Sequence, residues 1–177
     1  LGTFAIYHNK ISTPKELDFK LIEQFANLAR IAIEREKANK IIWQQANFDS
    51  LTNLPNRNLL HEHLTTAVDN AKRNQEQLAI IMLDLDNFKD VNDSLGHNAG
   101  DILLIDTAKR IKQCLRKNDI VARLGGDEFI IVLVGTSTDT DIDNIGQKLL
   151  NTLAQPYTIE QKSVYCTASI GIALYPN

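Results

Sequence analysis

The sequence lacks several features that would place the protein in a special class. No apolar run approaches the roughly 20 residues of a membrane-spanning helix, and the start of the chain, LGTFAIYHNK, lacks the basic-then-apolar pattern of a secretory signal. A formal net charge of −3 offers no basic surface for a polymeric nucleic acid. The chain has only two cysteines, Cys114 and Cys166, both in apolar patterns, so we expect reduced core residues rather than a disulfide. These absences favour a cytoplasmic globular protein without membrane contact in this segment, and they leave open a membrane tether elsewhere in a longer parent.

The first part of the chain predicts a strand followed by one long helix. Residues 1–7 have a strand composition, and Thr13 and Pro14 then favour the start of a helix that reaches about Ala46. A stripe of apolar residues at spacings of four, three and four runs along this helix: Leu21, Phe25, Leu28 and Ala32. Because little sequence lies nearby to cover such a stripe, it indicates a connector helix or a helix with a partner.

The segment NFDSLTNLPNR interrupts the helical pattern and predicts a domain boundary between residues 1–46 and 47–177. Beyond the boundary the patterns predict a helix, a strand, two helices, two strands, a helix and a final strand, at residues 58–74, 78–86, 88–97, 99–117, 119–124, 128–134, 139–155 and 164–175. Only Gly-Gly-Asp separates the two middle strands, which is typical of a hairpin. The order indicates an α+β fold with a mixed or antiparallel sheet and flanking helices.

Acidic residues end two of the predicted strands. Asp84 and Asp86 follow the apolar run Leu78–Leu83, and Asp127 and Glu128 open the strand after the two glycines. If these strands are neighbours, the carboxylates converge and repel one another. A hard divalent cation such as Mg²⁺ relieves that repulsion, and it binds one or two carboxylates together with substrate phosphates.

Two simpler interpretations of these acids stay open on the residues alone. Asp127 and Glu128 are also compatible with an ordinary solvated hairpin turn. Asp84 and Asp86 are likewise compatible with a solvated strand end. The agreement of two separate acidic segments favours the metal site over both.

The motifs then resemble a known family. Gly125–Phe129 spells GGDEF, the motif that names the GGDEF domains, which are bacterial diguanylate cyclases. Three further segments resemble that family in the same order, namely DSLTNLPNR from Asp49, DLDNFKDVNDSLGHNAGD from Asp84 and SIGIA from Ser169. The resemblance covers residues from about 47 to 177.

The resemblance implies a fold, a reaction and an assembly. The fold is similar to the palm of nucleotide cyclases and polymerases, a ferredoxin-like and mostly antiparallel sheet flanked by helices. The implied reaction condenses two GTP molecules into cyclic di-GMP and pyrophosphate across a homodimer, with Mg²⁺ or Mn²⁺ as cofactor. The homodimer forms through the connector helix and the active-site faces.

The same resemblance implies roles for individual residues. It assigns Asp84, Asp127, Glu128 and the Leu85 carbonyl to the metal, and Asp127 and Glu128 to catalysis. It assigns Asn92 and Asp101 to the guanine, whose donor and acceptor edges an amide and a carboxylate can satisfy together. The helix-capping role that these two residues also suggest is the alternative. The remaining substrate-binding residues implied are Phe88, Lys89, Gly125 and Gly126.

Regulation is implied at two further places. Arg116 and Asp119 match the family's RxxD inhibitory motif, at which the product binds, although a surface salt bridge is the common alternative for such a pair. Residues 1–35 resemble more loosely the last strand and helix of a GAF sensory domain. We therefore expect residues 1–46 to be a GAF remnant with a connector.

The chain also departs from the family pattern, and rival functions stay open. It starts without Met, and it ends before the phosphate-binding Lys and Arg that the family carries later, so we expect a truncated domain with weak or no activity. One alternative is a GTP-binding module that regulates a downstream EAL phosphodiesterase. Another is a cyclic di-GMP receptor that uses Arg116 and Asp119.

Overall fold

The computed structural model of the protein describes residues 7, 13–136 and 139–176. The strand predicted over residues 1–7 lies outside the described residues except for Tyr7. The chain divides into two compact units, Leu1–Gln45 and Ala46–Asn177, and each is considered by itself.

The first unit consists mainly of the helix α1 (Glu16–Asn47), which extends two residues into the second unit and confirms the predicted long N-terminal helix. Its start is favoured by Glu16 and Asp18 in the first turn, since carboxylates there complement the positive end of the helix dipole, and Asp18 accepts a bond of 2.7 Å from Lys15 N. No residue of α1 is buried, and the stripe residues Phe25 and Leu28 are 53% and 61% exposed. The helix therefore carries an uncovered apolar stripe.

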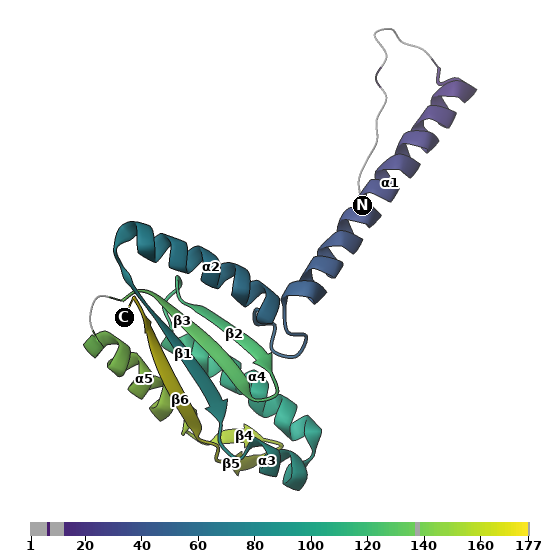
Figure 1. The fold of residues 1–177 in the computed structure, drawn as a ribbon. Coiled ribbons are helices and arrows are strands. Elements are labelled where there is room, and N and C mark those ends of the chain that lie inside the picture. The colour runs from purple at the N-terminus through teal and green to yellow at the C-terminus, as the bar shows by residue number, and fades with distance from the viewer. Residues whose placement is uncertain (1–6, 8–12, 137–138, 177) are drawn as a thin grey trace. The chain divides into compact units, whose positions relative to one another are not determined.

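The second unit is an α+β structure (Figure 1). Its elements are α2 (Arg57–Asn74), β1 (Gln77–Leu85), α3 (Phe88–Leu95), α4 (His97–Cys114), β2 (Ile120–Gly125), β3 (Glu128–Thr136), α5 (Asp139–Leu153), β4 (Tyr157–Ile159), β5 (Lys162–Val164) and β6 (Ala168–Tyr175). Four strands form one sheet in the order β2-β3-β1-β6, and every neighbouring pair is antiparallel. The predicted fold class is confirmed, and β2 and β3 form the predicted hairpin.

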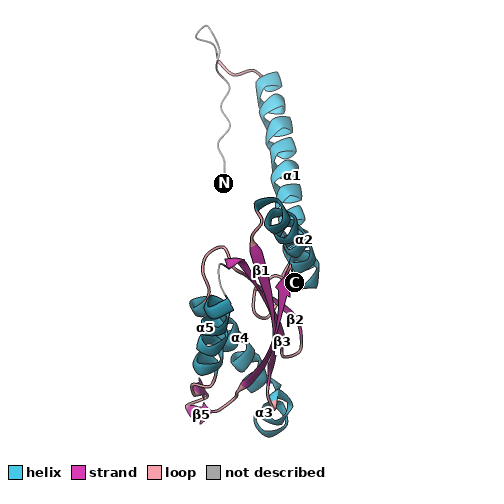
Figure 2. Ribbon diagram, turned by 60° about the vertical axis from the view of Figure 1, so that its left-hand side comes forward, coloured by secondary structure: helices cyan, strands magenta, loops and turns pink. Residues whose placement is uncertain are grey.

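Helices cover both faces of the sheet (Figure 2). Side chains alternate between the faces of a strand, so Ile81 and Leu83 of β1 pack in the larger core with α4 and α5. Leu78 of β1 belongs to a smaller core together with Leu60 and Ala67 of α2. The central strand β1 is thus buried on both faces along its first part, which explains its nearly continuous apolar sequence.

The final strand is shorter than predicted. The sequence predicts that the strand begins at Val164. In the structure Val164 instead ends the small hairpin β4–β5, and β6 begins only at Ala168. The hairpin turns at Glu160 and Gln161, both of which have positive φ. Neither residue type is a usual turn signal, so the sequence pattern gave no sign of this turn.

Among residues 7, 13–136 and 139–176, no helix combines the length and apolar character needed to cross a membrane.

Candidate functional site

Three predicted metal-binding carboxylates lie at one rim of the sheet. Asp84, near the end of β1, is the register partner of Glu128 on β3, and Asp127 precedes Glu128 in the hairpin turn. On its other side Asp84 is the partner of Ser169 on β6. The antiparallel pairing of β1 and β3 therefore brings together two acidic segments that are more than 40 positions apart in the sequence.

The rim faces open space because the covering helix does not reach it. Met82 and Asp84 lie on the same side of β1, and both are exposed, whereas Leu83 and Leu85 between and after them are buried. The α2 contacts on that side involve residues nearer the start of β1, such as Leu78. A ligand can consequently approach the carboxylates on this side of the sheet.

The carboxylates act on one another electrostatically. Partial burial and then the negative charges of Asp127, Glu128 and Asp86 raise the pKa of Asp84 above its ordinary value. Within the described part of the chain, no group of three acidic, His or Cys side chains is already arranged to hold a metal ion. Repelling oxygen donors nevertheless suit a hard cation that takes its remaining ligands from phosphates and water, so these residues fit Mg²⁺ or Mn²⁺.

Asp86 differs from the other acids because the protein already supplies its partners. Its carboxylate accepts bonds from the hydroxyls of Thr167 at 2.6 Å and Ser169 at 2.7 Å. Beside it, the buried thiol of Cys166 donates to the Asp86 carbonyl, and burial together with Asp86 and Asp127 raises the pKa of that thiol to about 11. Asp86 is therefore tied to the segment that leads into β6, and Cys166 stays protonated and unreactive at neutral pH.

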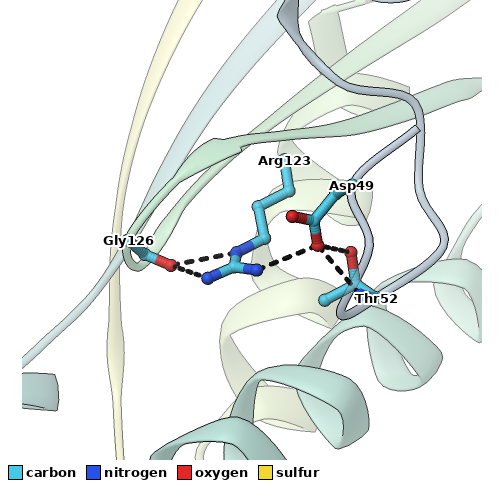
Figure 3. Close-up of polar contacts among 4 residues, drawn as sticks. All are labelled: Asp49, Thr52, Arg123 and Gly126. Atoms are coloured by element: carbon cyan, nitrogen blue, oxygen red, sulfur yellow. Dashed lines mark hydrogen bonds and ion pairs between the residues drawn. The ribbon is translucent and has the colours of Figure 1, made fainter. Parts of the chain in front are cut away.

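The glycine turn is held from one side by an arginine (Figure 3). Gly126 has a φ of 54°, which favours glycine, at the first of the two residues between β2 and β3. Its carbonyl accepts bonds from Arg123 Nε at 3.0 Å and Nη2 at 2.7 Å, and Arg123 Nη1 pairs with Asp49 Oδ1 at 2.9 Å. The sequence analysis assigns no role to Arg123 or Asp49, and the only signal for them is that Arg123 lies two residues before GGDEF and that Asp49 begins DSLTNLPNR.

The predicted base-binding residues lie on α3 and α4, which pack against each other. Phe88 is half-buried against the core and Lys89 is exposed on the same first turn of α3. Asn92 is half-buried on α3, and Asp101 is exposed on α4. At the junction of the two helices Gly96 N donates to the Asn92 carbonyl at 2.8 Å, and no N-cap side chain caps α3 or α4.

Gly100 is a further residue of this region that the sequence did not reveal. It is buried on α4, and a methyl group added there would overlap Asn92 Oδ1 and lie 2.9 Å from Asn92 Cγ. It would also lie 3.2 Å from the ring of Phe88. Because Gly100 has no side chain, the Asn92 amide can occupy the space beside it.

Given the guanine contact that the resemblance implies for Asn92, we predict that Gly100→Ala costs more free energy in GTP binding than in the stability of the fold. The new methyl group displaces the Asn92 amide, and loss of one neutral hydrogen-bonding group costs about 0.5–1.5 kcal/mol, or roughly 2- to 13-fold in affinity. Titration of GTP by calorimetry, with thermal unfolding alongside, measures both effects. The matched control is Gly171→Ala in β6, where an added methyl group meets nothing within 4 Å. Equal GTP affinity in the two variants would contradict the prediction.

The predicted inhibitory pair forms a turn and leaves its guanidinium available. Asp119 Oδ2 accepts a bond of 2.8 Å from the backbone N–H of Arg116, and Asp119 N donates to the Arg116 carbonyl. The exposed Arg116 guanidinium has no ion pair within the described residues. The surface salt bridge considered as an alternative does not form here.

Comparison with protein families supports the motif assignment. The family model described as "Diguanylate cyclase, GGDEF domain" matches residues 46–177. Among curated proteins, the bifunctional diguanylate cyclase/cyclic di-GMP phosphodiesterase MucR of Pseudomonas aeruginosa is 44% identical over 85% of this chain. The chain spans only 22% of MucR's length.

Solved structures show the same fold. The GGDEF domain of TpbB from Pseudomonas aeruginosa is 42% identical, with a TM-score of 0.71 over 73% of this chain and 76% of that one. The GGDEF domain of DgcB from Caulobacter crescentus, solved in complex with c-di-GMP, is 26% identical, with a TM-score of 0.68 over 73% of this chain and 77% of that one.

Proposed function

Because the chain belongs to the GGDEF family of diguanylate cyclase domains, we propose that it condenses two GTP molecules into cyclic di-GMP and two pyrophosphates. The observation that carries the proposal is the rim at which Asp84 and Glu128 are register partners and Asp127 adjoins them. Burial and then the neighbouring negative charges raise the pKa of Asp84, and carboxylates that repel one another in this way are suited to the cation-bound phosphates of a nucleotide. An ordinary solvated turn needs no such convergence.

The reaction makes two phosphodiester bonds between two bound nucleotides. In each step the 3′-oxygen of one GTP bonds to the α-phosphorus of the other, and the bond from that phosphorus to the β-phosphate bridging oxygen breaks. Pyrophosphate leaves, and the 3′-hydroxyl proton passes to Glu128 or to water. Because each protomer holds one GTP, two protomers have to present their rims to each other.

The chain's own residues position the nucleotide. Gly125 and Gly126 carry no side chains and so let phosphates approach the turn, and Lys89 supplies a cation for them. Asn92 and Asp101 pair with the guanine edge, and Phe88 packs at the start of the same helix. Asp84, Asp127 and the Leu85 carbonyl would hold Mg²⁺ or Mn²⁺, and the ion would supply Lewis-acid activation of the phosphate and of the attacking hydroxyl when bound.

The proposal is tested by incubating the chain with GTP and Mg²⁺ and measuring cyclic di-GMP by mass spectrometry. Formation of cyclic di-GMP that depends on the divalent ion supports it. A chain that binds GTP as a dimer and forms no cyclic di-GMP would overturn the cyclase assignment.

A regulatory role is the second candidate, and one observation favours it. MucR combines both activities in its name, and other similar curated proteins, such as PdeR of Escherichia coli, are named as phosphodiesterases. In such a protein this domain would bind GTP and control a neighbouring EAL phosphodiesterase domain. Phosphodiesterase activity of the longer protein that rises with GTP, without cyclic di-GMP synthesis, distinguishes this role.

We propose that product inhibition acts through Arg116 and Asp119. The exposed guanidinium can form paired bonds to a phosphate or a guanine edge, while the Asp119 carboxylate holds its own turn. If this site alone were functional, the chain would be a cyclic di-GMP receptor.

Arg116→Ala is expected to weaken cyclic di-GMP binding about 10-fold or more and to leave GTP binding unchanged. A charge-assisted bond is worth about 1.5–3 kcal/mol, which corresponds to roughly 10- to 150-fold. Calorimetric titration with each nucleotide measures the split. Lys117→Ala, which removes the neighbouring exposed cation, is the matched control. An Arg116→Ala chain that binds cyclic di-GMP normally would rule out the site.

A further inference from the structure

Arg123 joins two parts of the domain that are 74 residues apart in the sequence. Its side chain is only 10% exposed, and that of its partner Asp49 is 20% exposed. Burial alone would raise the pKa of Asp49, but bonds from Thr52 and Arg123 outweigh it and hold the pKa below its ordinary value. The ion pair is therefore charged at neutral pH and shielded from much of the solvent, unlike an ordinary surface pair.

The Asp49 side of this contact belongs to a closed loop at the end of α1. Asp49 N donates to the Leu54 carbonyl at 2.8 Å, and Asp49 Oδ1 accepts from Thr52 N at 2.9 Å and from the Thr52 hydroxyl at 2.6 Å. The side chains of Asn56 and Asn58 donate to the Ala46 carbonyl in the last turn of α1. These bonds fix the loop as a unit and attach it to the helix end.

The backbone of Arg123 is anchored to the same loop. Arg123 N donates to the Pro55 carbonyl at 3.0 Å. Arg123 thus receives its position from the loop through both its main chain and its side chain.

The other side of the contact is the peptide that leads into Asp127. Two N–H groups of Arg123 bind the Gly126 carbonyl oxygen, as Figure 3 shows. The peptide unit is planar, so holding that oxygen fixes the plane that includes the Asp127 nitrogen. Gly126 has no side chain that would limit the orientation of this peptide plane. The two hydrogen bonds from the Arg123 guanidinium supply that restraint instead.

We propose that Arg123 is a positioning residue: it transmits the geometry of the loop after α1 to the Gly126–Asp127 peptide and so sets where the Asp127 carboxylate lies. Its effect on turnover rests on the proposed function, whereas its effect on the peptide does not. A lysine cannot replace it, because a single ammonium lacks the planar fork that reaches Gly126 and Asp49 together.

The test compares three conservative variants. Arg123→Lys removes the fork, and Asp49→Asn keeps the guanidinium but removes the charge that orients it. Arg110→Lys is the matched control, because Arg110 also donates to main-chain carbonyls, those of Thr152, Gln155 and Pro156, away from the acidic rim. The readouts are thermal unfolding, the Asp127 amide nitrogen shift in NMR spectra without nucleotide, and kcat and KM for GTP.

In Arg123→Lys we expect the Asp127 amide nitrogen signal to move upfield. We expect kcat to fall about 10- to 100-fold, as is typical when a residue that holds a metal ligand in position is replaced. Asp49→Asn should show a smaller change of the same kind, with KM nearly constant. Arg110→Lys should lower the unfolding temperature without moving the Asp127 signal.

An unmoved Asp127 signal in Asp49→Asn would overturn the proposal, as would equal kcat losses in Arg123→Lys and Arg110→Lys. If Arg123→Lys fails to fold, Asp49→Asn decides by the same criteria. If the unaltered chain makes no cyclic di-GMP, the proposed function fails. The NMR comparison still tests whether Arg123 couples the loop after α1 to the Gly126–Asp127 peptide.

Discussion

Asp127→Asn should lower cyclic di-GMP formation by on the order of 10³-fold while leaving the protein at least as stable as before, since loss of one pre-organised electrostatic group costs about that much in catalysis. The stability follows from the repulsion among the rim carboxylates. Removing one negative charge next to Asp84 and Glu128 relieves that repulsion, whereas removing a structural residue would destabilise the fold. Activity assays and thermal unfolding measure the two effects separately.

The same variant should also change the pH at which Asp84 titrates. In the unaltered chain the pKa of Asp84 is raised, so the folded state binds this proton more tightly than the unfolded state does. Asp84 therefore adds stability below its unfolded pKa, ordinarily near 3.8, and this contribution is lost as the pH rises through the raised folded value. In Asp127→Asn the folded pKa should move back toward the ordinary value, which carboxyl NMR titration measures.

Asp69→Asn on α2 is the matched control, because it removes an exposed carboxylate away from the rim. Its activity and its effect on the Asp84 pKa should match those of the unaltered chain. A fully active Asp127→Asn protein, or one whose Asp84 titrates unchanged, would show that the rim carboxylates do not act as a unit.

Charged residues in the α1 stripe should strongly weaken dimer formation and lower turnover with it. Phe25 and Leu28 are 53% and 61% exposed, and an uncovered stripe of this spacing is suited to a partner helix. Burying such a side chain contributes about 1.5–3 kcal/mol, so Phe25→Glu with Leu28→Glu should weaken the dimer more than about 100-fold. Sedimentation at several concentrations measures the dissociation constant, and specific activity should fall in step with the dimer fraction.

The control adds the same two charges to the other side of the helix. Asn27→Glu with Gln45→Glu lies roughly opposite the stripe at 100° per residue. This variant should remain a dimer. A stripe variant that still dimerises with normal affinity would mean that the protomers meet through the catalytic unit alone.

The sequence predicted the main elements because long periodic segments carry their own signal. The stripe of α1 and the apolar run of β1 indicated their type, and the short Gly-Gly-Asp link indicated the β2–β3 hairpin. The rim was predictable only in part: strand ends and a tight turn indicate where Asp84 and Glu128 lie on their own strands, whereas their convergence depends on the pairing of β1 with β3. The motif resemblance then added roles that periodicity alone does not give.

The missed features depend on tertiary contacts. The strands β4 and β5 have three residues each, which is too short for a period to be visible. The role of Gly100 depends on where α3 packs on α4, and the contact of Arg123 with Asp49 joins segments that no local pattern relates. Asp86 was grouped with the rim acids, but hydroxyls from the segment leading into β6 occupy its carboxylate.

Because side chains alternate between the two faces of β1, the acidic rim forms only when this strand pairs in the correct register. Asp84 lies on the open side of the sheet between Leu83 and Leu85, which are 0% and 1% exposed. A slip of one residue in pairing would turn every side chain to the opposite face, burying the carboxylate and exposing the leucines. Such a misfolded chain could not gather the acids of β1 and β3, so under the proposed metal site affinity for a divalent ion would distinguish correctly paired molecules from slipped ones.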